Sequence, residues 1–383
     1  MTMSSLLAEA TFFSDVKELI NALCRPHWFL IIAVAGLSVF LAGYRRLTKP
    51  AVAAALAGLF TLFFLVSCLD PNFVKIVQKA DNVPIVMMMF AIGFFLWLSF
   101  RQAAVNDERM EKGRPLFEAG ADDKVLVWPD LVYIEFIALI LFTAFLTVWA
   151  VVLRAPLEQP ADPNVAPNPA KAPWYFLGLQ EMLVYFDPWL AGVLLPGLII
   201  VGLIAIPYID KNPRGNGYYT FKERPFAISM FLFGFVILWV ELILFGTFLR
   251  GPNWNFFGPY EYWDLHRPMA LLNTEFHDLF WIGLLGRALP AHDTVIIPGW
   301  LSIPAYLKRE APGIAMLATY FILGPLILRS LFFRKLYQQI GLARYSVMVM
   351  LLLVMLLMPI KMVLRWTLNL HYIVGITEWF LNV

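Results

Sequence analysis

Two acidic residues lie inside long apolar runs of this sequence. Glu241 is flanked on both sides by apolar residues in "FVILWVELILFG", and Glu135 stands near the start of the run "PDLVYIEFIALI". Charge in hydrocarbon is costly, so an acid at such a position usually serves a proton pathway or a partner group. Two interpretations stay open for each residue: a protonated acid bonded to a neighbouring helix, or a carboxyl group that transfers protons.

Histidines supply the axial ligands of transmembrane b-type haems, which need pairs of inward-facing histidines on neighbouring helices. All five histidines lie outside the apolar runs: His27, His266, His277, His292 and His371. We therefore expect no b haem to be held by this chain alone. Three of them share one loop, but their spacings of eleven and fifteen residues match no metal-binding motif. Solvated or hydrogen-bonded histidines, and no metal site, are expected there.

The composition places these residues in a membrane protein. Of 383 residues, 60% are hydrophobic and only 15% are charged, and the mean hydropathy is +0.71. Ordinary soluble domains are far more polar. A spanning helix needs roughly 20 predominantly apolar residues, and eight runs are continuously apolar rather than alternating as barrel strands do: 29–43, 51–69, 84–100, 131–153, 189–209, 226–249, 313–332 and 346–364. We predict an all-α, polytopic transmembrane protein with about eight spans.

Basic residues give the predicted orientation. With eight spans, four short loops share one side and together hold 15 Lys and Arg: 44–50, 101–130, 210–225 and 333–345. By the positive-inside rule this is the cytoplasmic side, so both termini face the outer, periplasmic side. The first 28 residues carry apolar residues at helical spacing, which predicts an interfacial amphipathic helix.

A proline-rich segment separates two spans on the predicted outer side. The stretch "EQPADPNVAPNPAKAP" has too many prolines for a helix or a central strand, which indicates a stiff, extended path. Trp174, Tyr175 and Phe176 then open a short helical stretch that reaches Tyr185. Most aromatic clusters of this kind are interfacial anchors. The rigidity of the prolines favours a shaped wall instead.

The order of motifs from 129 to 249 resembles the C-terminal half of cytochrome b. It is also similar to the separately encoded form of that half, subunit IV of the chloroplast-type cytochrome bc complex. "PDLVYIEFIAL" resembles the family's entry into its first helix, and "PADPNVAPNPAKAPWYF" aligns without gaps with its proline-rich loop. "LAGVLLPGLIIVGLIAIPYID" is similar to its second helix, and "ERPFA" to the entry into its third.

The resemblance implies a quinol-oxidation site on the outer side, partly walled by Pro173, Trp174, Tyr175 and Phe176. It implies a quinone as cofactor, with menaquinone as one candidate, and proton release coupled to electron transfer. The b haems would belong to a partner chain similar to the N-terminal half of cytochrome b. A Rieske iron–sulfur protein and c-type cytochromes would be further partners in a bacterial cytoplasmic-membrane complex, dimeric as in the family. Membrane lipids are expected contacts, and nucleic acid is not.

One departure from the family concerns the proton acceptor. Where the family has Pro-Glu-Trp-Tyr, this chain has Ala172, Pro173, Trp174 and Tyr175, so the glutamate that the family uses to accept a quinol proton is a proline. Tyr175 offers a hydroxyl group, but a phenol cannot replace a carboxylate base near neutral pH. Another acid must therefore take that proton if quinol is oxidised. Glu181 is the first candidate and Glu241 the second.

These observations predict six regions: an interfacial segment at 1–28, three extra spans at 29–100, a cytoplasmic linker at 101–128, the cytochrome b-like part at 129–250, an outer loop at 251–312, and two extra spans with a tail at 313–383. The preferred function is that of a subunit of a quinol:cytochrome c (or similar acceptor) oxidoreductase. The alternative is a non-catalytic scaffold that anchors another respiratory electron-transfer complex. A transporter is disfavoured, because the two halves show no repeated broken helices or paired charges.

Overall fold

The computed structural model describes every residue except 1–2, 121–125, 153–159, 269–272, 291–302 and 377–380. Its helices are α1 (Met3–Leu23), α2 (Pro26–Leu47), α3 (Pro50–Ser67), α4 (Pro71–Val77), α5 (Val83–Glu111), α6 (Val132–Val152), α7 (Leu177–Met182), α8 (Leu195–Ile209), α9 (Pro225–Leu232), α10 (Glu241–Leu244), α11 (Phe276–Asp278), α12 (Ile303–Leu331), α13 (Arg334–Ile340) and α14 (Leu342–Leu368). Two-residue strands β1 (Gly375–Ile376) and β2 (Leu381–Asn382) pair antiparallel.

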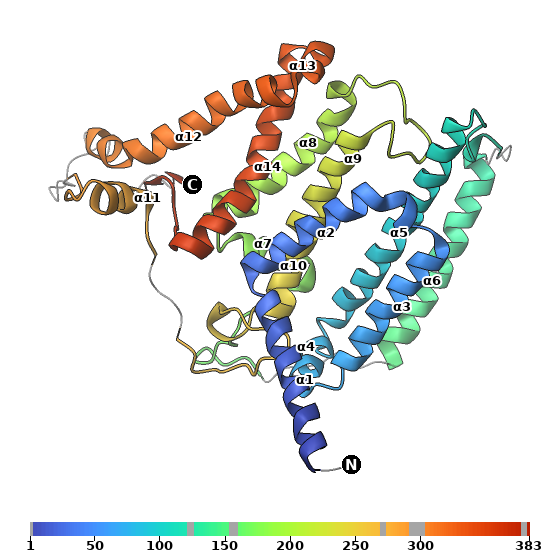
Figure 1. Ribbon diagram of the computed structural model, residues 1–383, viewed down its shortest axis with the longest axis horizontal. Helices are drawn as coiled ribbons and strands as arrows, with labels where there is room; N and C mark the ends of the chain where they lie inside the picture. The colour runs from blue at the N-terminus through green and yellow to red at the C-terminus, as the bar shows by residue number, and fades with distance from the viewer. Residues whose placement is uncertain (1–2, 121–125, 153–159, 269–272, 291–302, 377–380) are drawn as a thin grey trace.

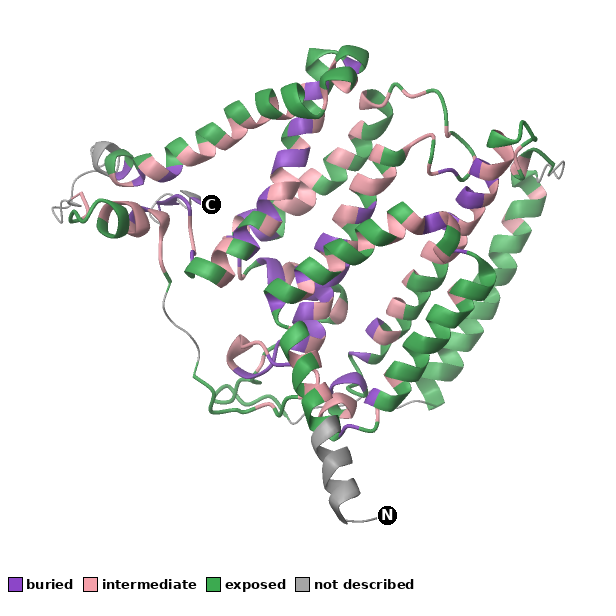
Figure 2. Ribbon diagram, viewed as in Figure 1, coloured by how far each residue is buried: buried purple, intermediate pink, exposed green. Residues whose placement is uncertain are grey.

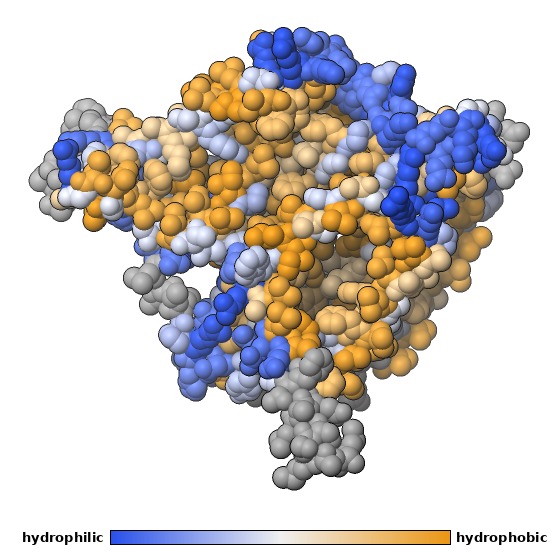
Figure 3. Space-filling model, viewed as in Figure 1, coloured by the Kyte–Doolittle hydropathy of each residue, from blue (hydrophilic) through white to orange (hydrophobic). Residues whose placement is uncertain are grey.

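Among the described residues, eight helices are long and apolar enough to cross a membrane, which confirms the all-α, polytopic prediction. They are Pro26–Leu47, Pro50–Ser67, Val83–Glu111, Val127–Val152, Leu190–Ile209, Pro225–Leu249, Tyr306–Leu331 and Leu342–Leu368. Figure 3 shows apolar surface over the middle of the bundle, with hydrophilic residues gathered toward its two ends. The side on which the termini lie stays a prediction.

Prolines fix where several of these helices begin. Proline is the first residue of α2, α3, α4 and α9, where its missing N–H is not needed for an intrahelical bond. Asp70 caps α4 by accepting hydrogen bonds from the backbone N–H groups of Asn72 and Phe73. The same carboxylate lies 2.6 Å from Nζ of Lys17, so this cap also holds α1.

The third span is longer than its apolar run predicts. The run ends at residue 100, whereas α5 continues to Glu111. Good helix formers such as Arg101, Gln102 and Ala103 follow the run and carry the helix on beyond the predicted hydrocarbon boundary. This polar extension brings Asp107 to the loop that follows α8.

The core lies around the span Pro225–Leu249, which we call the central span. It consists of α9, a π-helical segment (Phe233–Val240), α10 and a second π-helical segment (Phe245–Leu249). Of its most apolar window, 44% is buried, against 39% in α14 and none in Val127–Val152. The central span and α14 are therefore the two most buried of these spans, while α6 lies at the edge with its surface exposed (Figure 2).

Helices outside the cytochrome b-like part share this core. Leu242 and Phe245 of the central span belong to the same buried cluster as Leu30 of α2 and Met362 of α14. α2 and α14 lie beside the central span, whereas α3 and α6 lie farther out (Figure 1). The division into six regions stays a prediction. The packing makes α2 and α14 part of the support of the central span.

Asp107 joins two of these regions. Its fully buried carboxylate accepts hydrogen bonds from Tyr44 Oη at 2.7 Å and from Thr220 Oγ1 at 2.5 Å. It also accepts two backbone N–H groups, those of Phe221 and Lys222, each at 3.1 Å. One carboxylate thus ties α2 and α5 to the segment that leads into the central span.

We expect Asp107→Ala to destabilise the chain by about 3 kcal/mol, because four donors lose their acceptor in a buried place. The measurement is the thermal unfolding midpoint of the purified chain in mild detergent. Glu108→Ala is the matched control, since the Glu108 side chain has no hydrogen bond or ion pair with the described residues, and it should change stability by about 0.5 kcal/mol or less. Equal effects of the two substitutions would contradict the assignment.

Candidate functional site: the proline loop and a buried ion pair

The proline loop is pinned to the end of the central span. The structure describes it from residue 160 onward. Asn168 and Asn253 are joined by two hydrogen bonds, at 2.7 and 2.9 Å. Lys171 Nζ donates to the backbone oxygen of Thr247 at 2.8 Å and lies 5.1 Å from the ring centroid of Trp263. The loop therefore follows a fixed path across the helix end, as its prolines predict.

The Gln180 side chain closes the loop onto α7. Its Oε1 accepts from the backbone N–H of Ala172 at 2.8 Å, and its Nε2 donates to the backbone oxygen of Ala170 at 2.8 Å. Both groups belong to a proline-rich stretch that has few backbone partners of its own. This amide clamp sets where the following aromatic residues lie.

The four predicted wall residues form one turn at the start of α7. Tyr175 and Phe176 are about half exposed, at 53% and 50%, and their ring centroids are 4.8 Å apart. Pro173 is also exposed. Trp174 instead packs inward against a small cluster that contains Ile85 of α5. The turn thus presents Tyr175 and Phe176 outward and is anchored by Trp174.

Glu181, the first predicted proton acceptor, is fully buried in an ion pair with Arg250. Nη2 of Arg250 lies 2.7 Å from Oε1, and Nε lies 3.0 Å from Oε2. Tyr185 Oη donates to Oε1 at 2.9 Å and Trp254 Nε1 to Oε2 at 3.2 Å. Trp366 of α14 donates in turn to the Tyr185 oxygen. Every oxygen of this carboxylate is engaged.

The Glu181 carboxylate raises the pKa of its partner Arg250 and that of the neighbouring Tyr185. Burial opposes the charge of Arg250, but the Glu181 carboxylate outweighs it, so the pKa of the guanidinium is raised. Burial and then the negative charge of Glu181 raise the pKa of Tyr185 well above its ordinary value, so its phenol stays a donor. The guanidinium also stacks on Phe256, 3.6 Å from the ring centroid. The charged groups of this site are therefore bonded to each other and to neighbouring side chains.

Glu241, the second predicted acceptor, lies within the central span and is 1% exposed. It begins α10, between the two π-helical segments, a geometry that often marks functional positions. Neither of its carboxyl oxygens has a hydrogen-bond partner in the described part of the chain. Glu135, by contrast, is exposed on α6. Glu241 thus remains a buried acid that the rest of the described fold does not engage.

The three predicted catalytic residues are not brought together into one contact. Tyr175 is exposed, Glu181 is paired with Arg250, and Glu241 is buried within the helix bundle. The sequence interpretation missed Arg250, which it left without a role as the last residue of the cytochrome b-like part. Its only signal is its place directly after the apolar run "FGTFL", where a cation is close to buried groups.

Residues 160–258 match the family model described as Cytochrome b(C-terminal)/b6/petD. The resemblance to the C-terminal half of cytochrome b is confirmed for this segment. The segment holds the proline loop, α7, α8, the central span and Arg250, and amounts to about a quarter of the chain. The motif quoted from residue 129 lies before it, so α6 is outside the match. No solved structure matches the chain.

The described histidines of the helix starts and the outer loop have different surroundings. His27 lies in the first turn of α2, and His266 is exposed. His277 is buried against Glu275 and Glu310, and His292 lies outside the described residues. Of the three loop histidines of the sequence, only His266 and His277 can be compared, and only His277 is buried beside carboxylates. That the chain holds no b haem alone stays a prediction.

Removing the cation of the buried pair should be far more damaging than removing an exposed one. Arg250→Gln leaves Glu181 as a buried charge without a counter-ion, and we expect a loss of about 3–5 kcal/mol in the free energy of unfolding. Arg214→Gln is the control, because Arg214 is 75% exposed and lies 3.6 Å from Glu223; about 1 kcal/mol or less is expected. Thermal unfolding midpoints in detergent compare them.

The double variant Glu181→Gln/Arg250→Gln extends this test. Because it removes both charges, it should lose less stability than the sum of the two single variants, which is the signature of coupled groups. Additive losses would show that the two side chains act independently and would contradict the pairing.

The buried amino group of Lys171 should make the stability of the folded chain depend on pH. Burial, then the charges of Lys79 and Arg250, lowers its pKa from 10.5 to about 7. Because the unfolded chain keeps this proton up to a higher pH, the free energy of unfolding should rise as pH increases from about 7 toward 10. Lys171→Gln keeps a donor for Thr247 but does not titrate, so its midpoint should rise less over pH 7–9. Parallel pH curves for the two proteins would contradict the assignment.

Proposed function

We propose that the chain is a membrane subunit of a bc- or b6f-type quinol oxidoreductase, and that its proline loop forms part of the outer-side quinol-oxidation site. The observation that carries the proposal is the family match at 160–258, because it contains the described part of the proline loop, α7 and the central span. Tyr175 and Phe176 are the exposed side chains that would contact the quinol ring.

The rigidity of the loop supports this role. A binding wall must be held by a second layer of contacts, or it loses its shape when the ligand leaves. Here Gln180 clamps the loop to α7, and the Asn168–Asn253 pair fixes it to the segment after the central span. The Glu181–Arg250 pair then joins α7 to the end of that span. A mere interfacial anchor would not need these connections.

The geometry suggests different roles for the two predicted acids. If Glu181 took a proton, Arg250 would be left as a buried cation without its counter-ion, which is expensive. We therefore propose Glu181 as a positioning residue. Glu241 would be the proton acceptor, because α10 packs against α7 and its carboxyl group has no competing partner among described residues. The Tyr175 hydroxyl would hydrogen-bond the quinol.

The proposal includes the partners that the resemblance implies. A haem b-carrying chain would receive one electron and a Rieske protein the other, with c-type cytochromes as acceptors and menaquinone as the candidate quinone. The chain would lie in the bacterial cytoplasmic membrane with the loop facing the periplasm, and the complex would be dimeric. α6, with no buried position in its apolar window, leaves ample surface for partner chains and lipid.

A second candidate function is a non-catalytic scaffold of another respiratory complex. Two observations favour it: the position of the family's loop glutamate holds Pro173, and the next acid along the chain, Glu181, is buried in an ion pair with Arg250. In that case the loop would keep its shape as a docking element without oxidising quinol.

Purification in mild detergent with the native partners separates the two. The catalytic proposal expects a haem b chain and a Rieske protein to accompany this chain, and quinol to reduce the haems in a reduced-minus-oxidised spectrum. Co-purification with partners that lack both cofactors would support the scaffold and overturn the first proposal.

Within the catalytic proposal, Glu241→Gln should slow quinol oxidation by about 100-fold or more, the usual contribution of a positioned proton acceptor. Glu261→Gln is the control, because Glu261 is an exposed acid of the outer loop, and its turnover should match the unaltered complex. Haem content of both variants must equal that of the parent. Unchanged turnover in Glu241→Gln would remove this residue from the mechanism.

A further inference from the structure

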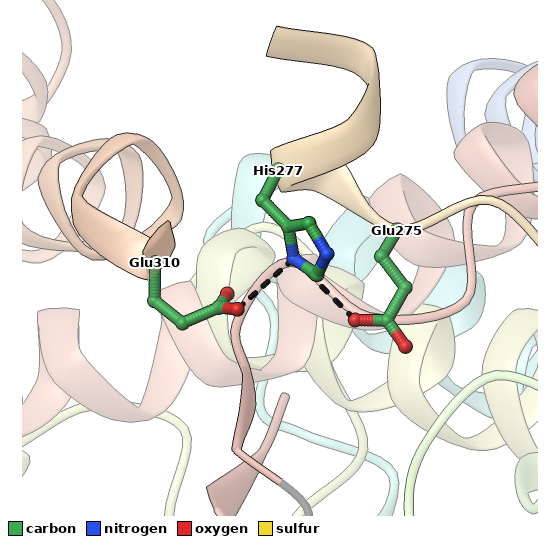
Figure 4. Close-up of side chains that lie close together, drawn as sticks. All are labelled: Glu275, His277 and Glu310. Atoms are coloured by element: carbon green, nitrogen blue, oxygen red, sulfur yellow. Dashed lines mark ion pairs between the residues drawn. The ribbon is translucent and has the colours of Figure 1, made fainter. Parts of the chain in front are cut away.

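Three side chains of metal-ligand type meet between α11 and α12. Glu275 caps the N-terminus of α11, His277 lies within α11, and Glu310 lies near the start of the span Tyr306–Leu331. One ligand atom from each lies within 4.8 Å of the others. In Figure 4 both carboxyl groups point toward the imidazole from opposite sides.

The imidazole of His277 is buried between two carboxylate groups. His277 is 7% exposed, and its Nδ1 lies 3.0 Å from Oε1 of Glu310 and 3.5 Å from Oε2 of Glu275. Despite this proximity, Nδ1 has no hydrogen-bond partner with acceptable geometry among the described residues. A buried nitrogen between two carboxylates without a hydrogen bond is a feature that a shared cation would explain.

The surrounding groups resemble the outer shell of a metal site. Glu310 is fully buried, and its oxygens accept from Arg309 Nε at 2.9 Å and from the backbone N–H of Gly375 at 3.2 Å. Nε2 of His277 lies 3.6 Å from a carboxylate oxygen of Asp278, on the side away from Glu310. Ligating carboxylates and histidines are typically oriented by such neighbours.

The local charge fits a divalent ion. Glu275, Asp278 and Glu310 carry three negative charges and Arg309 one positive charge, so these side chains together with the neutral, metal-binding form of His277 have a net charge of two negative. One imidazole nitrogen and two carboxylate oxygens suit zinc and neighbouring first-row divalent metals better than they suit a purely oxygen-seeking ion.

We propose that Glu275, His277 and Glu310 bind a divalent transition-metal ion of the zinc class, with water completing the coordination. The ion would connect α11 to α12. The C-terminal segment is held beside it, because Arg309 of α12 donates to the backbone oxygen of Gly375 at 3.0 Å. The site is independent of the proposed quinol chemistry.

The test uses the full chain purified in mild detergent, stripped with a chelator and dialysed against buffered free Zn²⁺. Zinc per chain is measured by mass spectrometry, and X-ray absorption at the zinc edge identifies the ligand atoms. We expect one zinc per chain, nitrogen and oxygen ligands without sulfur, and a zinc-dependent rise in the thermal unfolding midpoint.

His277→Ala and Glu310→Gln should each weaken zinc binding by about tenfold or more. Glu275→Gln tests the same site with less risk to folding, because Glu275 is 28% exposed. His266→Ala and Glu261→Gln, exposed residues of the same outer loop, should bind zinc like the parent chain. Parent binding no tighter than that of the three site variants, or sulfur in the zinc shell, would overturn the proposal and leave His277 as an ion-pair partner of Glu310.

Discussion

The buried pair between Glu181 and Arg250 is the interaction on which the candidate site depends. It joins α7, which directly follows the aromatic turn, to the residue directly after the central span. A buried ion pair gains little over an apolar contact of the same shape, but the loss of one partner is severe. Here both charges have further hydrogen bonds, from Tyr185 and Trp254 and to the Trp254 backbone. The pair therefore fixes geometry more than it adds stability.

Helices outside the matched segment contribute to this arrangement. Trp366 of α14 completes the hydrogen-bond chain at Tyr185, and Trp174 packs with Ile85 of α5. Leu30 of α2 lies in the core that buries the central span. The segment similar to cytochrome b is thus supported by spans that its own family model does not include. Asp107 of α5 likewise bonds to Thr220 in the matched segment and to Tyr44 of α2.

Buried acids in this chain follow different solutions to one physical problem. A carboxylate removed from water must find a cation, a set of donors, or its own proton. Glu181 finds Arg250 and Asp107 finds four donors, whereas Glu241 has no partner within the described structure. Glu310 has a guanidinium, a backbone N–H and a nearby imidazole. These contrasts distinguish Glu241 and the Glu310 cluster from acids with a purely structural role.

The sequence by itself determined the class of the protein. The eight spans could be predicted because the backbone N–H and C=O groups of a span must be hydrogen-bonded within the span, which favours a helix. The length and hydropathy of each run were therefore sufficient to predict it. The proline loop was readable for a similar local reason, since proline restricts the chain wherever it occurs. Only the tertiary structure decided which side chains contact one another. Glu181 and Arg250 are 69 residues apart, and Glu275 and Glu310 are 35 apart. No periodicity links residues at such distances, because helix packing rather than local geometry brings them together.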